Sequence, residues 1–347
     1  MSRGGPSESP PGSLLHRVLG AIRAVEPARP GGPLAALVSS AKDPADRAKE
    51  LARRVAAARH PRASRPGQPF VLICAADHGL ALADRRSPDD VGSSASALRA
   101  IADGRAAVDA LARSAGAALV LVDCGVALAP ALSEQPAPLP AHIIDLRIGD
   151  GTADIRHGPA MTDAQARSCV DSGIALGLSL AEEGADCIAL GHVARGADAA
   201  IEIASAVLVG LPTRLLRPPL EELAGAVCAV HARACDDARE PLTLLARLGG
   251  YAVGVMAGVI LAAASERIPV VLDDPGTALA ALLSARLCPA VTGYLFAAHA
   301  GHSPGHQQVL YQLGLAPIFE QGVARGEGAG AALAVPILAS ATHTVAS

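Results

Sequence analysis

The sequence predicts an α/β fold in which a doubly wound, mostly parallel sheet carries helices on both faces. Short apolar runs rich in β-branched residues alternate along the chain with alanine-rich segments of helical length. This alternation is typical of parallel strands joined by crossover helices, which bury a sheet on both sides. A length of 347 residues and a hydrophobic content of 51% are sufficient for one large core, alone or with a smaller lobe.

The expected strands end at polar or glycine residues, and the expected helices lie between them. Strands are predicted at Phe70–Cys74, Ala118–Val122, His142–Asp145, Asp186–Leu190, Ile268–Leu272 and Tyr294–Ala297. Helices are predicted over 94–115, 162–183, 219–235 and 252–266, and again in the apolar run 331–338 near the C-terminus.

Polar side chains follow the expected strands, and in a parallel sheet ligands bind beyond the carboxyl ends of the strands. Each of these residues alone would suit a loop or a helix cap. Together they predict one site, which contains Asp77, His78, Asp123, His192, Asp273 and His299.

Glu327 lies between glycines in the segment Gly326–Gly330, directly before the last expected helix. Glycines let a ligand approach the backbone closely, and a helix N-terminus stabilises a carboxylate. On this segment alone, Glu327 is best interpreted as an ordinary helix-capping acid.

Composition excludes several classes of protein. The net charge is -4 and aromatic residues make up 2% with no Trp, which argues against nucleic-acid binding. Lys42 and Lys49 are the only lysines, so any phosphate contact beyond residue 50 must come from arginine, histidine or backbone amides. The first 13 residues are rich in Gly, Pro and Ser and lack the apolar core of a signal peptide, which predicts a flexible tail.

The cysteines indicate a reducing compartment. There are 7 of them, most lie in apolar runs, and none forms a C-x-x-C pair. No strongly apolar run reaches the length of a membrane span. We therefore expect a soluble, cytoplasmic protein with no membrane partner.

A series of motifs gives the chain a family resemblance. In chain order they are Ala75–Gly79, Val122–Val126, Gly151–Asp154 with Gly158–Thr162, Leu248–Gly250, Val270–Asp273, His299 with Pro304–His306, and Gly326–Leu333. With these motifs the chain, from about residue 15 to its C-terminus, resembles the nicotinate-nucleotide:dimethylbenzimidazole phosphoribosyltransferase family of cobamide lower-ligand synthesis.

The resemblance implies an organisation of the chain. A flexible tail of residues 1–13 would precede an N-terminal helical part of a small lobe at 14–66. The large α/β domain would span 67–300, and C-terminal helices at 301–347 would complete the small lobe and the active site. The family also implies a homodimer, with a heteromer containing a paralogue as the alternative.

The resemblance further implies a reaction that uses no cofactor. A ring nitrogen of a benzimidazole-type base attacks C1 of the ribose of nicotinate mononucleotide, nicotinate leaves, and the sugar inverts from β to α. By position, Glu327 corresponds to the family's general base. Asp77, His78, Gly79, Gly151, Thr152, Gly326 and Gly328 are then expected to bind substrate with the other strand-end residues.

The chain departs from the family in the loop that holds the nucleotide. Where the family has Gly-Glu-Met-Gly-Ile-Gly-Asn-Thr-Thr, residues 191–199 retain only Gly191 and Gly196, and the glutamate is replaced by His192. Asp198 adds a negative charge near the expected phosphate, and Arg195 would partly compensate by gripping phosphate with its guanidinium. The family's arginine three residues before the base is Ala324, with Arg325 adjacent.

The expected base pocket differs as well. Instead of the family's serine and glutamine, the chain has Arg85 and Arg86 followed by Ser93, and the late Ser-x-Glu is replaced by Gly301-His302-Ser303. Arginines there would suit an anionic ring, or they are solvent-facing loop charges.

Three functions are therefore open. The first is phosphoribosyl transfer to a benzimidazole-type or related aromatic base. The second is a catalytically impaired family member that acts as a partner subunit or ligand-binding protein. The third is metal-assisted hydrolysis by His299, His302 and His306. Because Ser303-Pro304-Gly305 interrupts any regular helix there, a structural or substrate-binding role for these histidines is preferred to a metal site.

Overall fold

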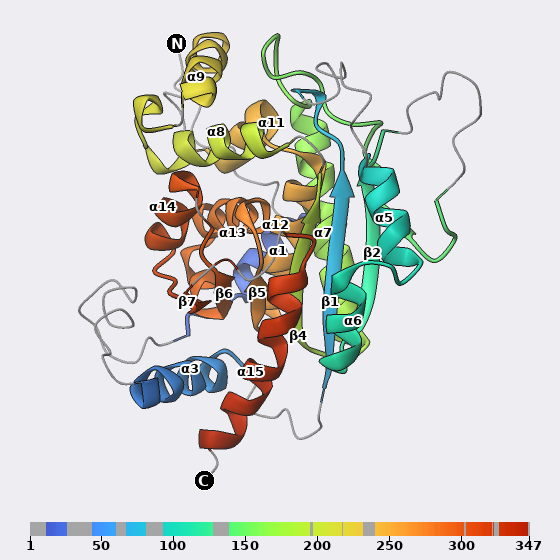
Figure 1. The fold of residues 1–347 in the computed structure, drawn as a ribbon, viewed down its shortest axis with the longest axis vertical. Helices are drawn as coiled ribbons and strands as arrows, with labels where there is room; N and C mark the ends of the chain where they lie inside the picture. The colour runs from blue at the N-terminus through green and yellow to red at the C-terminus, as the bar shows by residue number, and fades with distance from the viewer. Residues whose placement is uncertain are drawn as a thin grey trace.

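The structure, a computed structural model, describes residues 12–25, 44–59, 67–80, 93–127, 139–194, 197–216, 218–231, 240–301, 303–320, 322 and 326–345. Every structural statement below concerns these residues. The fold prediction is confirmed: a parallel sheet lies at the centre of the molecule with helices on both faces (Figure 1).

The sheet has 7 strands in the order β3-β2-β1-β4-β5-β6-β7, and every neighbouring pair is parallel. The chain builds outward from β1 to β3 and then returns to place β4 on the other side of β1. The order of strands therefore reverses between β1 and β4. In open α/β sheets, this reversal is where ligands bind. The strands are β1 (Gln68–Ala76), β2 (Ala118–Gly125), β3 (Ile144–Asp145), β4 (Ala185–Val193), β5 (Val270–Leu272), β6 (Leu295–His299) and β7 (Pro317–Phe319).

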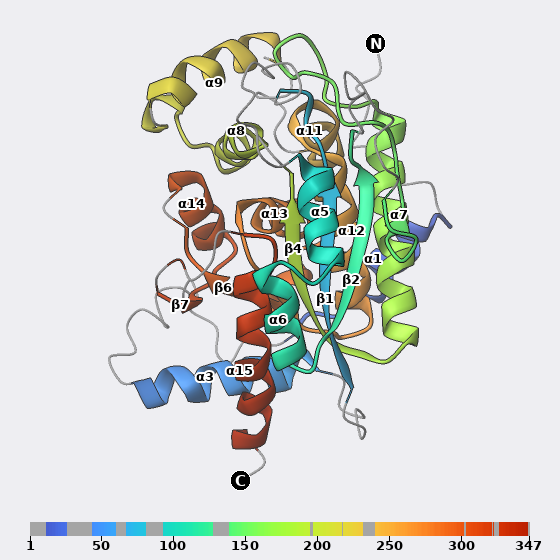
Figure 2. The ribbon, with the colours of Figure 1, turned by 45° about the vertical axis from the view of Figure 1, so that its right-hand side comes forward.

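Two groups of helices cover the faces of the sheet (Figure 2). One face carries α5 (Ser94–Ala102), α6 (Ala107–Ser114) and α15 (Ala329–Val345). The other carries α1 (Leu14–Ala21), α7 (Asp163–Glu182), α12 (Tyr251–Ser265) and α13 (Pro275–Leu287).

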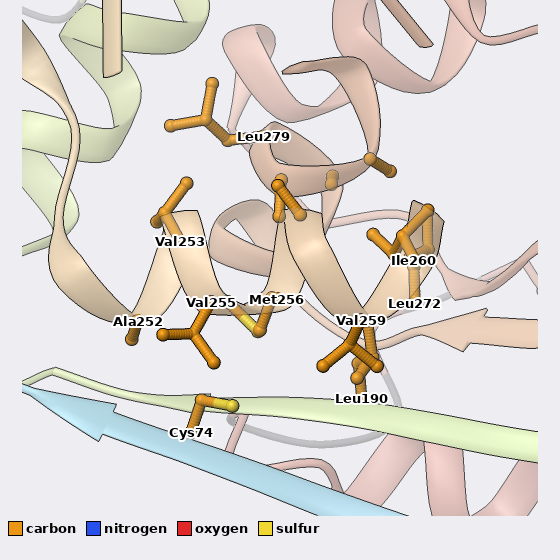
Figure 3. Packing of buried hydrophobic residues seen from close by; sticks show 14 of the residues in the cluster. Cys74, Leu190, Ala252, Val253, Val255, Met256, Val259, Ile260, Leu272 and Leu279 are labelled. Carbon is orange, nitrogen blue, oxygen red and sulfur yellow. The ribbon is translucent and has the colours of Figure 1, made fainter. Parts of the chain in front are cut away.

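The core is densest where α12 crosses the central strands. This helix is buried from Tyr251 to Ala264, which explains why its sequence is apolar on every side. Figure 3 shows Val255, Met256 and Val259 packed toward Cys74 of β1 and Leu190 of β4. This close packing against α12 fixes the positions of β1 and β4, and with them the residues at the carboxyl ends of these strands.

Further helices lie beyond the carboxyl ends of the strands, at the top of Figures 1 and 2. They are α8 (Asp198–Val209), the 3-10 turn η1 (Thr213–Leu215), α9 (Pro218–Val230) and α11 (Pro241–Leu248). After the short helix η2 (Pro289–Tyr294) and β6, α14 (Pro304–Gln312) packs against α8 and α13.

At the opposite end of the molecule, α3 (Pro44–Ala58) packs against α15 (Figure 1). The division of the chain into a small lobe and a large domain stays a prediction. None of the helices within the described residues is long and apolar enough to cross a bilayer.

Most predicted elements are found close to their predicted bounds, with four differences. The predicted helix 94–115 is two helices, because the chain turns at Gly104 with φ 70°. The strand predicted at His142–Asp145 is reduced to Ile144–Asp145, and β7 was not predicted at all. Helix α9 ends at Val230, and the rest of the predicted segment lies largely outside the described residues.

Candidate active site

A pocket lies at the reversal point of the sheet, beyond the ends of β1 and β4. It is partly open to solvent. Most of its lining is small and apolar, and its polar side chains within the described residues are Asp77, His78 and His192. Ala197, Ala200, Gly249 and Gly250 belong to the small, apolar part of the lining.

Asp77 and Asp123 hold the loops around this pocket. Asp77 accepts hydrogen bonds from the Ser94 hydroxyl at 2.6 Å and from the Ala127 amide at 2.8 Å. Asp123 accepts from the amides of Gly125 and Val126 with Oδ1, while Oδ2 accepts from Arg147 at 2.8 Å. Both carboxylates are buried and bonded through both oxygens. Their expected role in substrate binding stays a prediction.

The segment around Gly151 and Thr152 closes over the end of β1. Gly151 has φ 81°, and the Thr152 amide donates to the carbonyl of Asp77 at 3.2 Å. In return, the Gly79 amide donates to the Thr152 hydroxyl at 3.1 Å. These bonds fix the loop that follows the pocket residues Asp77 and His78, and the predicted substrate-binding role of Gly79, Gly151 and Thr152 stays a prediction.

His78 and His192 are buried, uncharged imidazoles in the pocket. Burial lowers the pKa of His78 to about 4, and the Gly249 backbone and Asp154 oppose this only in part. Burial also lowers the pKa of His192 to about 4, with a smaller contribution from the nearby His78. Within the described residues, His78 Nε2 has no hydrogen-bond partner.

The turn Gly326–Gly328 carries Glu327 against the end of β4. All three residues are left-handed, with φ 86°, 61° and 82°, and Glu327 is one of only two such non-glycine residues among those described. A Cβ on Gly191 would lie 2.6 Å from Gly328 Cα, so the two backbones touch. A left-handed non-glycine residue is strained, and such strain is common at functional sites.

Asp273, at the end of β5, caps helix α15. Its Oδ2 accepts from the Gly328 amide at 2.9 Å, and its Oδ1 accepts from the Ala331 amide at 2.8 Å. Glu327 was predicted to lie at the N-terminus of this helix, and it does. However, Asp273 takes the amides that a capping acid at 327 was expected to take.

Asp274 follows β5 in the chain and lies next to the pocket residue His192. It was not predicted as a site residue. Its Oδ1 accepts from the Thr277 amide at 2.9 Å, which caps α13, while its Oδ2 lies 4.0 Å from His192 Nδ1. Burial, and then the charge of Asp273, raise the pKa of Asp274 to about 7. The only signal in the sequence was that Asp274 directly follows the strand-end residue Asp273.

Of the candidate metal residues, His299 and His306 lie within the described residues. His299 Nε2 lies 3.6 Å from Asp273 Oδ1, and the proximity of Asp273 raises the pKa of His299. His306 instead lies in α14, where its Nδ1 accepts from the Gly301 amide at 3.1 Å. No group of three metal-binding side chains occurs within the described ranges. His302 lies outside them.

The remaining predicted site residues lie either outside the pocket lining or outside the described residues. Ser93 is exposed and caps α5 by accepting from the Ser96 amide at 3.2 Å. The predictions for Arg86, Arg195, Gly196 and Arg325 fall on residues outside those described.

Comparison with known proteins gives a consistent result. A family model described as phosphoribosyltransferase matches residues 46–347. A nicotinate-nucleotide--dimethylbenzimidazole phosphoribosyltransferase from Azotobacter vinelandii is 39% identical over 282 residues, which is 79% of this chain and 78% of that protein. A relative of the same name from Roseiflexus sp. strain RS-1 is 35% identical, over 79% of this chain and 77% of its own.

A solved structure agrees with these matches. The nicotinate-nucleotide-dimethylbenzimidazole phosphoribosyltransferase from Thermus thermophilus superposes with a TM-score of 0.75 at 30% identity, over 90% of this chain and 94% of the other. The sequence motifs and the fold thus agree with the comparisons, and the chain belongs to the phosphoribosyltransferase family.

Proposed function

We propose that the protein transfers phosphoribose from nicotinate mononucleotide to a benzimidazole-type aromatic base. The observation that carries this proposal is the left-handed conformation of Glu327, in a turn whose Gly328 lies against Gly191, the residue before the pocket residue His192. The names of the relatives support the same pair of substrates. The product would be a ribazole-type phosphate of the kind used as a cobamide lower ligand.

The reaction needs few groups from the protein. A nitrogen of the base forms a bond to C1 of the ribose as the bond from C1 to the nicotinate nitrogen breaks. The nicotinate nitrogen is already cationic in the nucleotide, so it leaves without a general acid. The Glu327 carboxylate accepts the proton that the base loses, and the enzyme aligns the two rings across the sugar.

The lining of the pocket suits an aromatic ring in its polarity, because most of it is apolar. Ala197 and Ala200 contribute small apolar side chains, and Gly249 and Gly250 contribute backbone only. The remaining site residues, including Asp273, His299, Gly326 and Gly328, would act by positioning the Glu327 turn. This assignment of roles is part of the proposal.

The decisive test is binding and turnover of nicotinate mononucleotide. A nucleotide that binds only the folded protein stabilises it by about 2.7 kcal/mol at 100 times its Kd, so the melting temperature should rise. With a benzimidazole present, nicotinate should be released and seen by chromatography, and Glu327→Gln should abolish the release. If millimolar nucleotide neither raises the melting temperature nor releases nicotinate, the catalytically impaired member is the better description.

We further propose a cytoplasmic homodimer. Cys74, Cys124, Cys169 and Cys187 are buried free thiols, as expected in a reducing compartment. Leu333 and Ile337, one turn apart on α15, are 36% and 37% exposed and give an apolar strip suited to a subunit contact. Sedimentation of the purified protein would distinguish a dimer from a monomer, and a monomer that gains activity only with a paralogue would favour the heteromer.

A further inference from the structure

His299 is a buried imidazole without a hydrogen bond. It is the last residue of β6 and is 4% exposed, and neither of its ring nitrogens has a hydrogen-bond partner within the described residues. Its Nε2 lies 3.6 Å from Asp273 Oδ1, which is within the range of an ion pair but too long for a hydrogen bond. A buried polar ring in this position is destabilised while it is neutral and unpaired, and it is stabilised when it carries the charge opposite to that of its neighbour.

The carboxylate that His299 faces holds the turn of Glu327. Asp273 is 0% exposed, and its two oxygens accept from the amides of Gly328 and Ala331 at 2.9 and 2.8 Å. Both oxygens therefore act as acceptors, as they do in an ionised carboxylate. A buried negative charge also needs a counter-charge. Among the described residues, the side chain that supplies an ion pair to Asp273 is His299.

A second carboxylate strengthens the case for a protonated ring. Contact with Asp273 raises the pKa of His299 above its usual value, the charge of Asp274 adds to this, and burial opposes it only in part. Within the described part of the chain, the other titratable ring near His299 is His306 of α14. Burial, and then His299, lower the pKa of His306 to about 4, so that ring is neutral. One imidazole therefore faces two acids and one neutral ring.

Helix α15 approaches this pair of side chains closely. A Cβ on Gly330 would lie 2.6 Å from Asp273 Oδ1 and 2.6 Å from His299 Cδ2. A glycine at this position is what permits the first turn of α15 to rest on both side chains. A change in the charge of the pair would therefore act directly on the helix turn that follows Glu327.

We propose that His299 is an imidazolium that serves as the counter-ion of Asp273 and Asp274, and that loss of its proton loosens the cap of α15 and sets the alkaline limit of the transfer reaction. His299 is a positioning residue, which acts on Glu327 through Asp273 and the bond from the Gly328 amide. Once the ring is neutral, the two carboxylates have no counter-ion between them and hold the amides less firmly. The inference rests on the proposed transfer reaction and adds the charge state and the pH range in which the turn is held.

The first measurement follows the histidine by NMR in the ligand-free protein. The His299 ring resonances, identified by their absence from His299→Gln, should titrate with a midpoint above the usual value of about 6.5. The Gly328 amide resonance should move with the same midpoint. Asp274→Asn, whose side-chain oxygen can still accept from the Thr277 amide, should lower the midpoint because it removes one negative charge. A ring that titrates at or below its usual value, or a Gly328 amide that does not follow it, would overturn the inference.

The second measurement compares kcat of the wild type and His299→Gln from about pH 6 to about pH 9, with nicotinate mononucleotide and a benzimidazole at saturation. A hydrogen bond to a charged group is typically sufficient for about a tenfold change in rate. We therefore expect the wild type to exceed the variant about tenfold at the acid end. The two curves should converge as the pH rises through the midpoint seen by NMR, because the wild-type ring then loses its charge.

His231→Gln is the matched control. His231 is also 4% exposed, but its Nε2 donates to the carbonyl of Ile155 at 2.7 Å, away from the acids. Any effect of this variant on kcat should be the same factor at every pH.

Two results of the kinetic comparison would contradict the inference and leave the transfer reaction standing. A ratio of wild type to His299→Gln that is constant with pH would show that His299 serves packing alone. An alkaline fall that disappears in Asp274→Asn while the NMR midpoint of His299 is unchanged would make Asp274 the titrating group. If the folded wild type releases no nicotinate at any pH, the transfer reaction itself fails, and the NMR midpoints still decide the charge of His299.

Discussion

Replacing Glu327 by alanine and by glycine separates its backbone conformation from its chemistry. Both variants remove the carboxylate and all its contacts, so the difference between them reports the backbone alone. Glu327 has φ 61°. An L-residue in the left-handed region is strained by roughly 1–2 kcal/mol, which glycine avoids. Glycine in turn makes the unfolded chain more flexible, which costs about 0.4–1 kcal/mol relative to alanine.

The net expectation is that Glu327→Gly is about 1 kcal/mol more stable than Glu327→Ala. The free energies of unfolding would come from urea titration of the ligand-free proteins. Glu222, exposed in α9, is the control position, because there the helix should make glycine about 1 kcal/mol less stable than alanine. The order of the two variants therefore reverses between the two positions.

Both variants at 327, and Glu327→Gln, should lose transfer activity while they remain folded. If glycine at 327 is no more stable than alanine, as at the helical control, then residue 327 is not left-handed in solution and the strain argument fails. If the folded glycine variant keeps wild-type activity, Glu327 is not the base.

Three further perturbations follow from the contacts around this turn. Asp273→Ala removes a buried carboxylate that accepts two helix amides, so urea titration should show a loss of about 3 kcal/mol or more. Gly191→Ala would place a Cβ 2.5 Å from Ile73 and 2.6 Å from Gly328; we expect about 1–3 kcal/mol of destabilisation and, in the folded protein, a displaced turn with lower kcat. Burial lowers the pKa of His306 to about 4 from 6.5. Its contribution to stability is therefore present above pH 6.5 and lost as pH falls toward 4, and a stability–pH curve for His306→Gln should be flatter in that window.

The sequence located the sheet and the edge that carries the site. Buried parallel strands need continuous apolar runs, so β1, β2 and β4 are visible in composition alone, and the residues after them mark the carboxyl edge. The edge strand β7 is 3 residues long and half-buried, which leaves no such pattern. The break at Gly104 was hidden because the alanine-rich sequence continues on both sides of it.

The roles of the individual acids could not be predicted, because each depends on which distant amide it meets. Asp77 bonds to Ala127, 50 residues away, and Asp273 bonds to Gly328, 55 residues away. No local pattern encodes such pairs. The sequence therefore assigned the cap of α15 to the nearest acid, Glu327, and the structure assigns it to Asp273.

This reassignment changes what must be explained about Glu327. Helix capping does not account for it, since Asp273 already accepts from the amides of Gly328 and Ala331. Backbone geometry does not account for it either, since a left-handed position favours glycine, and both neighbours in the turn are glycines. A strained residue of this kind is what the proposed role of the Glu327 carboxylate as general base leads one to expect.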